Sequence, residues 1–272
     1  MELLNLLYGT VLLRPYVFIF LGVYIVVAML NMGIIRTLLF TVLAHSIAFL
    51  SEYSSTRNGF PYGLYHYIDT TRNQELWISN VPLMDSLSYS FLSYISYSMG
   101  LLLWSPLKGK DWDVQIVERE AIKNSLRVIF SAALLFMLLD VIIDPVAFRG
   151  DRWFLGKIYT YEEEGEYFNV PLTNFAGWFV VGATILFSFR KADSFLTRKG
   201  LKDFGKRDIP GKALLGPGIY FGVITFNLAV TFFIGETLLG LCGTLITLTL
   251  LALIIYKIRV PEKFVMLPQE NT

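Results

Sequence analysis

The segment Thr237–Tyr256 reads TLLGLCGTLITLTLLALIIY and contains no charged residue. A helix needs about 20 such residues to cross the hydrocarbon core of a bilayer, and this segment has that length. The preceding run, Leu214–Ile234, is also uncharged. Only Gly235 and Glu236 separate the two runs. The pair therefore predicts two membrane-spanning helices that are joined by a short turn.

The rest of the chain has the same character. Of its 272 residues 54% are hydrophobic and only 17% are charged, whereas soluble domains contain about 25% charged residues. We therefore predict an all-α, polytopic integral membrane protein with about seven transmembrane helices in one domain, residues 1–272. The expected spans lie near 16–30, 34–51, 81–104, 128–144, 174–189, 214–234 and 237–257, and residues 1–15 form an interfacial segment.

The basic residues predict the orientation. With the N-terminus outside, 17 of the 23 lysines and arginines lie in segments on the inner side. An excess of Lys and Arg marks cytoplasmic segments. We therefore expect the N-terminus outside, the C-terminus in the cytoplasm, and a multi-pass protein of the cell (inner) membrane.

Composition also excludes several function classes. The net charge of +1 gives no sign of a nucleic-acid partner. A single cysteine, Cys242, excludes a site built from several cysteines. Two histidines, His45 and His66, are too few for the histidine-rich di-iron centre of membrane desaturases and hydroxylases.

Acidic residues gather at the predicted outer ends of the spans. Asp140 and Asp144 lie one helical turn apart, so their carboxyl groups share a face. Glu52 ends the second span, with His45 seven residues earlier on roughly the same face, and Asn174 opens the fifth. Acids inside membrane spans are costly and usually functional. Two carboxylates this close in a low dielectric do not both ionise easily, which would place an acid beside a base. A solvated pair, or one bound to Arg149 or Arg152, is the alternative.

Two long outer loops carry aromatic residues and turn formers. The first contains Gly59-Phe-Pro-Tyr-Gly-Leu-Tyr-His-Tyr67, and the second runs from Asp144-Pro145 to Trp178. This composition favours ordered loops over flexible linkers. Because Pro145 disfavours helix at the residue before it, we expect the fourth span to end at Asp144.

These motifs, in this order, resemble a family of carotenoid biosynthesis membrane proteins, the carotenoid 1,2-hydratases. The resemblance covers roughly residues 40–178. It rests on His45, Glu52, the loop 59–67, Val81-Pro82, Asp140, Asp144-Pro145, Trp153, Tyr167-Phe-Asn-Val-Pro171 and Asn174-Phe-Ala-Gly-Trp178.

The resemblance implies a cofactor-independent hydro-lyase that adds water to the terminal C1–C2 double bond of an acyclic carotenoid, similar to lycopene or gamma-carotene. The expected catalytic residues are Asp140, Asp144 and Glu52. An acid among them would protonate the alkene, and water would capture the tertiary carbocation. Membrane lipid would surround the helices. The expected substrate-binding residues are His45, Tyr62, Tyr65, His66, Tyr67, Trp153, Asn174 and Trp178, although aromatic residues at these ends also fit an interfacial belt.

Other functions fit parts of the pattern. A carotenoid end-group cyclase also begins by protonating an alkene, but a neighbouring alkene then captures the cation. A transporter could use intramembrane acids, although here they gather at one end of the spans instead of the midplane. A structural membrane subunit is a further alternative. Asp140-x-x-x-Asp144 is similar to one magnesium–diphosphate motif of membrane prenyltransferases, but those enzymes carry two, so we predict no metal site.

Overall fold

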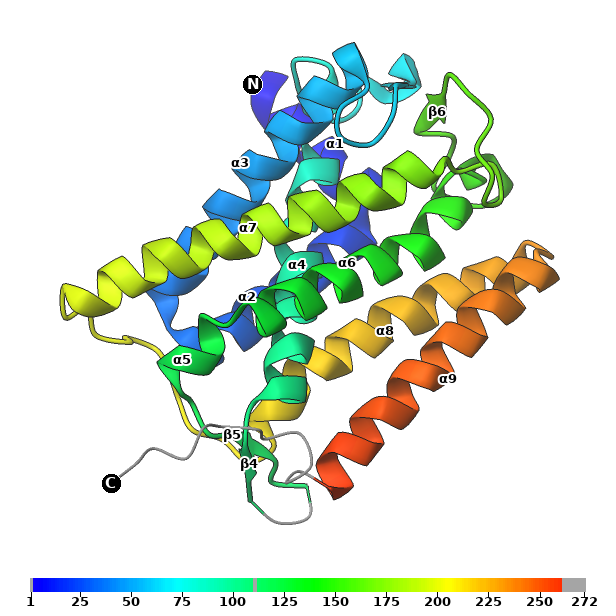
Figure 1. Ribbon diagram of the computed structural model, residues 1–272. Helices are drawn as coiled ribbons and strands as arrows, with labels where there is room; N and C mark the ends of the chain where they lie inside the picture. Colours follow the sequence, from blue (N-terminus) through cyan, green and yellow to red (C-terminus); the bar gives the residue numbers. More distant parts are fainter. Residues whose placement is uncertain (1, 110–111, 261–272) are drawn as a thin grey trace, which may run out of the picture.

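The computed structural model describes residues 2–109 and 112–260. The chain forms a bundle of long helices (Figure 1). The helices are α1 (Glu2–Leu13), α2 (Pro15–Met32), α3 (Ile34–Asn58), α4 (Leu83–Trp104), α5 (Glu120–Lys123), α6 (Leu126–Ala147), α7 (Leu172–Arg198), α8 (Lys212–Phe233) and α9 (Thr237–Arg259). This architecture confirms the predicted all-α, polytopic membrane fold.

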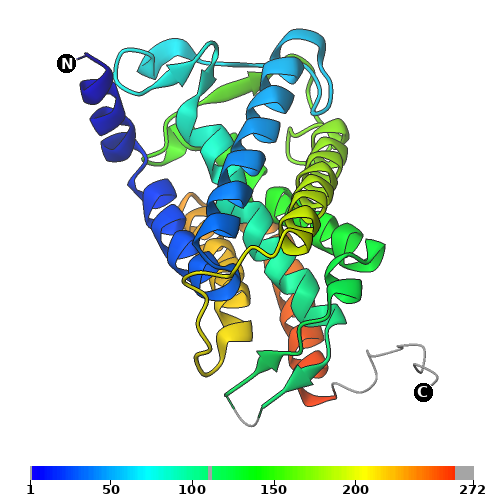
Figure 2. The same ribbon diagram turned by 90° about the vertical axis from the view of Figure 1, so that its left-hand side faces the viewer.

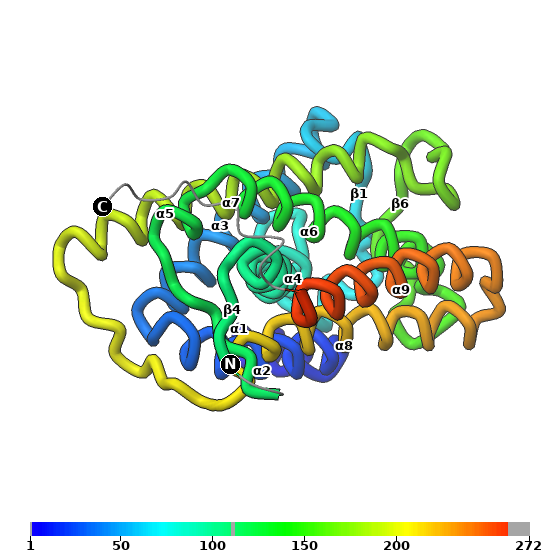
Figure 3. Tube along the Cα trace, turned by 60° about the horizontal axis from the view of Figure 1, so that its bottom comes forward, coloured from blue at the N-terminus to red at the C-terminus, as the bar shows by residue number. Residues whose placement is uncertain are grey.

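Six helices, α2, α3 and α6 to α9, are long and apolar enough to cross a membrane. Helix α4 corresponds to the remaining predicted span, 81–104, and its 22 residues are also sufficient in length. Its six serines and three tyrosines make it much less apolar. It lies in the centre of the bundle, where it packs against α2, α3, α6 and α8. Figure 3 shows α4 almost end-on, with the other helices around it.

Five of the six serines of α4 are hydrogen-bonded within the protein. Ser93 donates to the carbonyl of Tyr89 at 2.5 Å, and Ser96 donates to the carbonyl of Leu92 at 2.8 Å. Close packing against neighbouring helices also shields α4 from lipid. A side chain at Gly100 would collide with Ala132 of α6, since its Cβ would lie 3.0 Å from the Ala132 Cβ. Polar groups in α4 are thus kept away from lipid, as a membrane helix requires.

The ends of some helices differ from the predicted ones. Helix α6 continues to Ala147, so the prediction that it ends at Asp144 is wrong. Pro145 lacks only its own N–H, and the amide of Phe148 still bonds to the carbonyl of Asp144 at 2.8 Å, which closes the last turn. Helix α3 runs seven residues past the predicted end, to Asn58. There Gly59 adopts the left-handed conformation (φ 80°) that ends many helices. Helix α7 reaches Arg198, nine residues past residue 189.

The two aromatic loops pair with each other at one end of the bundle. Strand β1 (Tyr65–Tyr67) lies antiparallel to β6 (Tyr159–Tyr161). The same end holds the short pair β2 (Trp77–Ile78) and β3 (Val81–Pro82), and also helix α1, as Figure 2 shows. We call it the acidic end, because the C-terminal turns of α3 and α6 carry Glu52 and Asp144 there. The opposite, basic end holds β4 (Leu107–Lys108), β5 (Gln115–Ile116) and the loop 199–211.

A buried ion pair fixes the entry into α2. The guanidinium of Arg14 bonds to the carboxylate of Glu75 (3.2 Å) and to the carbonyl of Leu155 (2.5 Å). The two charged side chains are 3% and 0% exposed. A charge buried this deeply is stable only with its partner.

We therefore expect Arg14→Ala to lower the free energy of unfolding by about 3 kcal/mol or more, because Glu75 would remain charged and buried. Thermal unfolding in detergent measures the change. The matched control is Arg72→Ala, which breaks the exposed Arg72–Asp69 pair and should cost less than about 1 kcal/mol. Equal losses in the two variants would contradict the structural role of the buried pair.

Candidate active site

The strand pair at the acidic end directs tyrosines toward the bundle. Tyr65 and Tyr67 are 7% and 8% exposed, while His66 between them is exposed. This alternation is the normal period of a strand. In register with them, Tyr159 and Tyr161 of β6 lie opposite Tyr67 and Tyr65. The pairing therefore places four phenol groups together above the ends of α3 and α6.

Two of these phenols bind Asp144. The hydroxyl of Tyr159 donates to Oδ1, and the hydroxyl of Tyr161 donates to Oδ2 at 2.8 Å. The amide of Asn174, on the first turn of α7, donates to Oδ2 of Asp144 at 3.2 Å and to Oδ2 of Asp140 at 2.6 Å. Asn174 thus links the two carboxyl groups that the sequence placed on one helix face.

Asp140 accepts fewer hydrogen bonds than Asp144. It is 1% exposed, and its Oδ1 atom is buried without a hydrogen-bond partner among the described residues. Leaving a charged oxygen in this position costs far more free energy than leaving a neutral one. The alternative pairing with Arg149 or Arg152 is not formed, since both arginines bind Glu236 instead. The surroundings therefore favour a neutral Asp140 beside a hydrogen-bonded, ionised Asp144.

A second acidic pair faces the first from other helices. Glu52 of α3 is 2% exposed and accepts a hydrogen bond from Ser86 of α4. The hydroxyl of Tyr67 interacts with both Glu52 and Asp85. Asp85 lies on the first turn of α4. Two helices and one strand thus bring two further carboxyl groups to the same place.

A small cavity of about 40 Å³ lies between these groups. This volume holds about one water molecule. An aromatic stack closes it toward the bundle centre, because Trp178 lies parallel to Tyr89 at 4.5 Å and tilted to Phe136 at 4.6 Å. The lining residues are Glu52, Tyr62, Tyr65, Tyr67, Asp85, Tyr89, Asp144, Tyr159, Tyr161, Asn174 and Trp178.

Four of the lining residues were missed by the sequence analysis: Asp85, Tyr89, Tyr159 and Tyr161. One signal was available for the last two, because both loops contain a Tyr-x-Tyr pattern, at Tyr65–Tyr67 and at Tyr159–Tyr161. Such alternation is typical of paired strands. Asp85 carries a weaker signal, a single acid at the start of a helix that is otherwise uncharged.

Three predicted substrate-binding residues do not line this cavity. His66 points to the outside. Trp153 donates to the carbonyl of Val146 at 3.1 Å and packs against Phe154. His45 is half-buried, two turns from Glu52, and its Nδ1 atom is buried without a partner in the described part of the chain.

The loop tyrosines of the site are held neutral. Burial raises the pKa of Tyr62, Tyr65, Tyr67, Tyr159 and Tyr161 well above the usual value near 10, and the neighbouring carboxylates raise it further. Their hydroxyls therefore remain hydrogen-bond donors at neutral pH. In residues 2–109 and 112–260, no three His, Cys, Asp or Glu side chains are arranged to hold a metal ion.

We expect these five tyrosines to stay protonated while the unfolded chain releases its tyrosine protons near pH 10. Tyrosinate absorbance of folded and denatured protein across about pH 9 to 11 measures the difference. Since the folded chain then holds more protons, its stability should fall as the pH rises above 10. Tyr161→Phe should leave the folded titration unchanged in this range. A smaller amplitude in that variant would contradict the raised pKa.

Comparison with known proteins agrees with the resemblance found in the sequence. A family model described as "carotenoid biosynthesis protein" matches residues 13–255, which include the long helices from α2 to α8 and all but the last turn of α9. None of the curated proteins and none of the solved structures matches the chain. Because the match covers nearly the whole chain, this membrane protein belongs to the carotenoid biosynthesis protein family.

Proposed function

We propose that the protein adds water to the terminal C1–C2 double bond of an acyclic carotenoid, as a hydratase of the cell (inner) membrane. One observation carries the proposal: three carboxyl groups and five loop tyrosines line one small cavity, and Asn174 links a fourth carboxyl group, that of Asp140, to it. Alkene hydration requires a strong positioned acid, a base for water and a site that tolerates a cation. The acidic end offers side chains for each role.

The acid in this proposal is the Asp140–Asp144 pair, which holds one proton between its carboxyl groups. The proton would pass from Asp140 to Asp144, which lines the cavity, and from Asp144 to C2, leaving a tertiary cation at C1. Tyr159, Tyr161 and Asn174 donate hydrogen bonds to Asp144. Because these bonds stabilise the carboxylate that remains, they make Asp144 a stronger acid toward the alkene. The proton that the base takes from water later returns to the pair through solvent water, which restores the acid for the next turnover.

The base is Glu52 or its neighbour Asp85, which approach from α3 and α4. A water in the cavity attacks C1 while one of these carboxylates takes its proton. The new C–O bond gives a tertiary alcohol. One proton has entered at C2 and one has left the water, so the reaction consumes only water and needs no redox cofactor.

The intermediate cation would be stabilised by aromatic faces. Trp178 and Tyr89 stack in the cavity wall, and Tyr62 lies 6.5 Å from Trp178 between ring centroids. A cation within about 6 Å of such rings gains roughly 2 kcal/mol when water is excluded.

The end group of a carotenoid is larger than the 40 Å³ cavity. Entry therefore requires the tyrosines of the two loops to move apart. Most of the polyene would remain in lipid or along the apolar helix surfaces, which suits a substrate that is itself dissolved in the bilayer.

Expression in a lycopene-producing bacterial host tests the proposal, with the pigments analysed by mass spectrometry. We expect new pigments heavier by one or two waters, and their absence in Asp144→Asn, which retains the shape but loses the acid. New pigments with unchanged mass would instead identify a cyclase. Unchanged pigments from well-expressed wild-type protein would contradict lycopene hydration and bring transport back into consideration.

The phenol donors provide a second test. Replacing Tyr161 by Phe removes one hydrogen bond to a charged group, which is worth roughly 1.5–3 kcal/mol, and should slow product formation about tenfold to a hundredfold. Tyr53→Phe is the matched control, because Tyr53 lies on α3 but does not line the cavity. Equal rates in the two variants would remove Tyr161 from the mechanism.

A further inference from the structure

A large cavity lies at the basic end, away from the carboxylate site. Its volume is about 490 Å³. Its floor is the second half of α4, with Tyr94, Tyr97 and Leu101, and Phe189 of α7 forms a wall. Fully buried side chains such as Tyr24 and Phe40 lie against Tyr94 on its inner side. The basic-end cavity is therefore a separate site.

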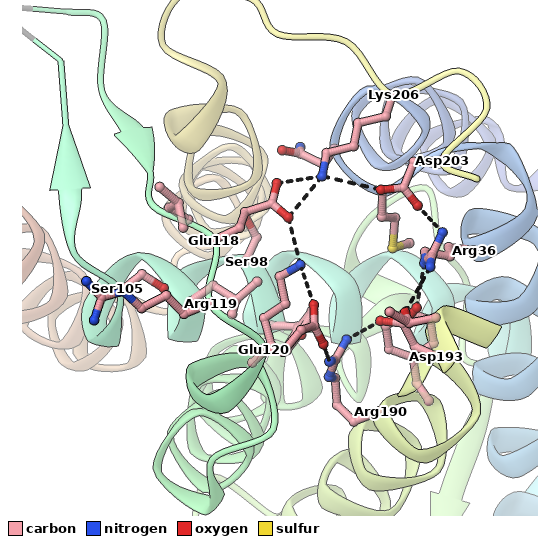
Figure 4. A pocket seen from close by; sticks show the side chains of 18 of the residues that line it. Arg36, Ser98, Ser105, Glu118, Arg119, Glu120, Arg190, Asp193, Asp203 and Lys206 are labelled. Atoms are coloured by element: carbon pink, nitrogen blue, oxygen red, sulfur yellow. Dashed lines mark hydrogen bonds and ion pairs between the residues drawn. The ribbon is translucent and has the colours of Figure 1, made fainter. Parts of the chain in front are cut away.

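A closed ring of eight alternating charges surrounds the mouth of this cavity (Figure 4). Each base contacts two acids. Lys206 binds Glu118 and Asp203, Lys123 binds Glu118 and Glu120, Arg190 binds Glu120 and Asp193, and Arg36 binds Asp193 and Asp203. The ring joins α3, α5 and α7 to the loop 199–211 and the segment before α5.

The ring is ionised and electrically neutral. Burial alone would raise the pKa of Glu118, but hydrogen bonds from Lys123 and Lys206 lower it to about 2. All four acids that line the cavity belong to the ring. Arg119 and Lys202 also line the cavity, and within the described residues neither has an acidic partner. The mouth therefore carries an excess of positive charge.

The floor of this cavity contains a hydroxyl group that has no hydrogen-bond acceptor among the described residues. Tyr97 is 4% exposed and lines the cavity, and its hydroxyl is buried with no hydrogen-bond partner in residues 2–109 and 112–260. The charges of Arg190 and Lys123 act on this hydroxyl. A buried unpaired hydroxyl costs free energy unless a ligand or water completes it.

These features together describe a site with an apolar floor, a buried donor and a cationic rim. We propose that the basic-end cavity binds the anionic head group, phosphate or carboxylate, of a membrane amphiphile. An oxygen of the head group accepts the hydrogen bond of Tyr97, and Arg119 and Lys202 neutralise its charge. Apolar carbon atoms next to the head group pack on Leu101 and Phe189. This site is independent of the hydration chemistry at the acidic end.

Retention of added lipid by the full chain, purified in a neutral detergent, tests the proposal by native mass spectrometry. The probes are phosphatidylglycerol, oleate and phosphatidylcholine with matched acyl chains. We expect the two anionic probes to be retained roughly tenfold more tightly than phosphatidylcholine, since each nearby Lys or Arg contributes about 1 kcal/mol toward an anionic lipid. The probe that is retained best identifies phosphate or carboxylate as the source.

Two variants locate the site. Arg119→Gln with Lys202→Gln should abolish the preference for anionic probes, and Tyr97→Phe should weaken their retention while leaving every ring charge in place. The matched control is Lys191→Gln with Lys199→Gln, which removes the same charge from α7 outside the cavity.

Three results would overturn the proposal. They are equal retention of phosphatidylglycerol and phosphatidylcholine, equal losses in the cavity variant and the control variant, and full displacement of phosphatidylglycerol by an equal concentration of inorganic phosphate. The last result would assign the cavity to a soluble anion. None of them bears on hydration, which the pigment masses measure separately.

Discussion

Helix α4 can lie at membrane depth only if other helices cover it. Lipid offers no hydrogen bonds, so the serine and tyrosine hydroxyls of α4 must find partners inside the protein or face one of its cavities. The structure meets this constraint by surrounding α4 with α2, α3, α6 and α8. Ser90 donates across to the carbonyl of Thr41 on α3 at 3.3 Å, and Tyr220 of α8 donates to the carbonyl of Leu135 on α6 at 2.8 Å. The need to shield α4 from lipid thus determines where the helices around it lie.

Both cavities are consequences of the same arrangement. A central polar helix with covered sides is accessible only at its two ends. At one end Asp85 and Tyr89 of α4 meet the acids of α3 and α6, and at the other Tyr97 and Leu101 form the floor below the ring of charges. Between them the bundle is filled by fully buried side chains, including Phe40 and Phe136. The protein can therefore hold two chemically different sites without a path between them.

Hydropathy predicted every long helix, because a membrane span is a local property of about 20 residues. Helix ends were predicted less well. The polar residues after position 51 gave no apolar signal for the last turns of α3. Pro145 removes only one backbone hydrogen bond, which is not enough to end α6. At the site, spacing placed Asp140 and Asp144 on one face, since i and i+4 positions follow from helix geometry alone.

The parts that sequence reasoning missed depend on contacts between distant segments. Tyr161 reaches Asp144 because β6 pairs with β1, and Tyr161 lies opposite Tyr65 in that pair. No local pattern reveals such a register. The same holds for the ring of charges, where Arg36 contacts Asp193 and Asp203, more than 150 residues away. His45 shows the limit of local spacing: it lies on roughly the same helix face as Glu52 but does not line the small cavity, and its predicted role in substrate binding stays a prediction.

The pairing of β1 with β6 also links the proposed chemistry to folding, because it positions the tyrosines that bind Asp144. Buried carboxyl groups repel one another when they ionise, and hydrogen-bond donors reduce that cost. For Asp144 the donors are Tyr159 and Tyr161, which stand opposite it only when β6 is paired with β1. Until the two loops meet, Asp144 lacks the bonds that stabilise its charge, and the free-energy cost favours the proton staying on the pair. In the proposed hydration, the strong acid that protonates the alkene is thus a property of the assembled loops, and α6 alone would not supply it.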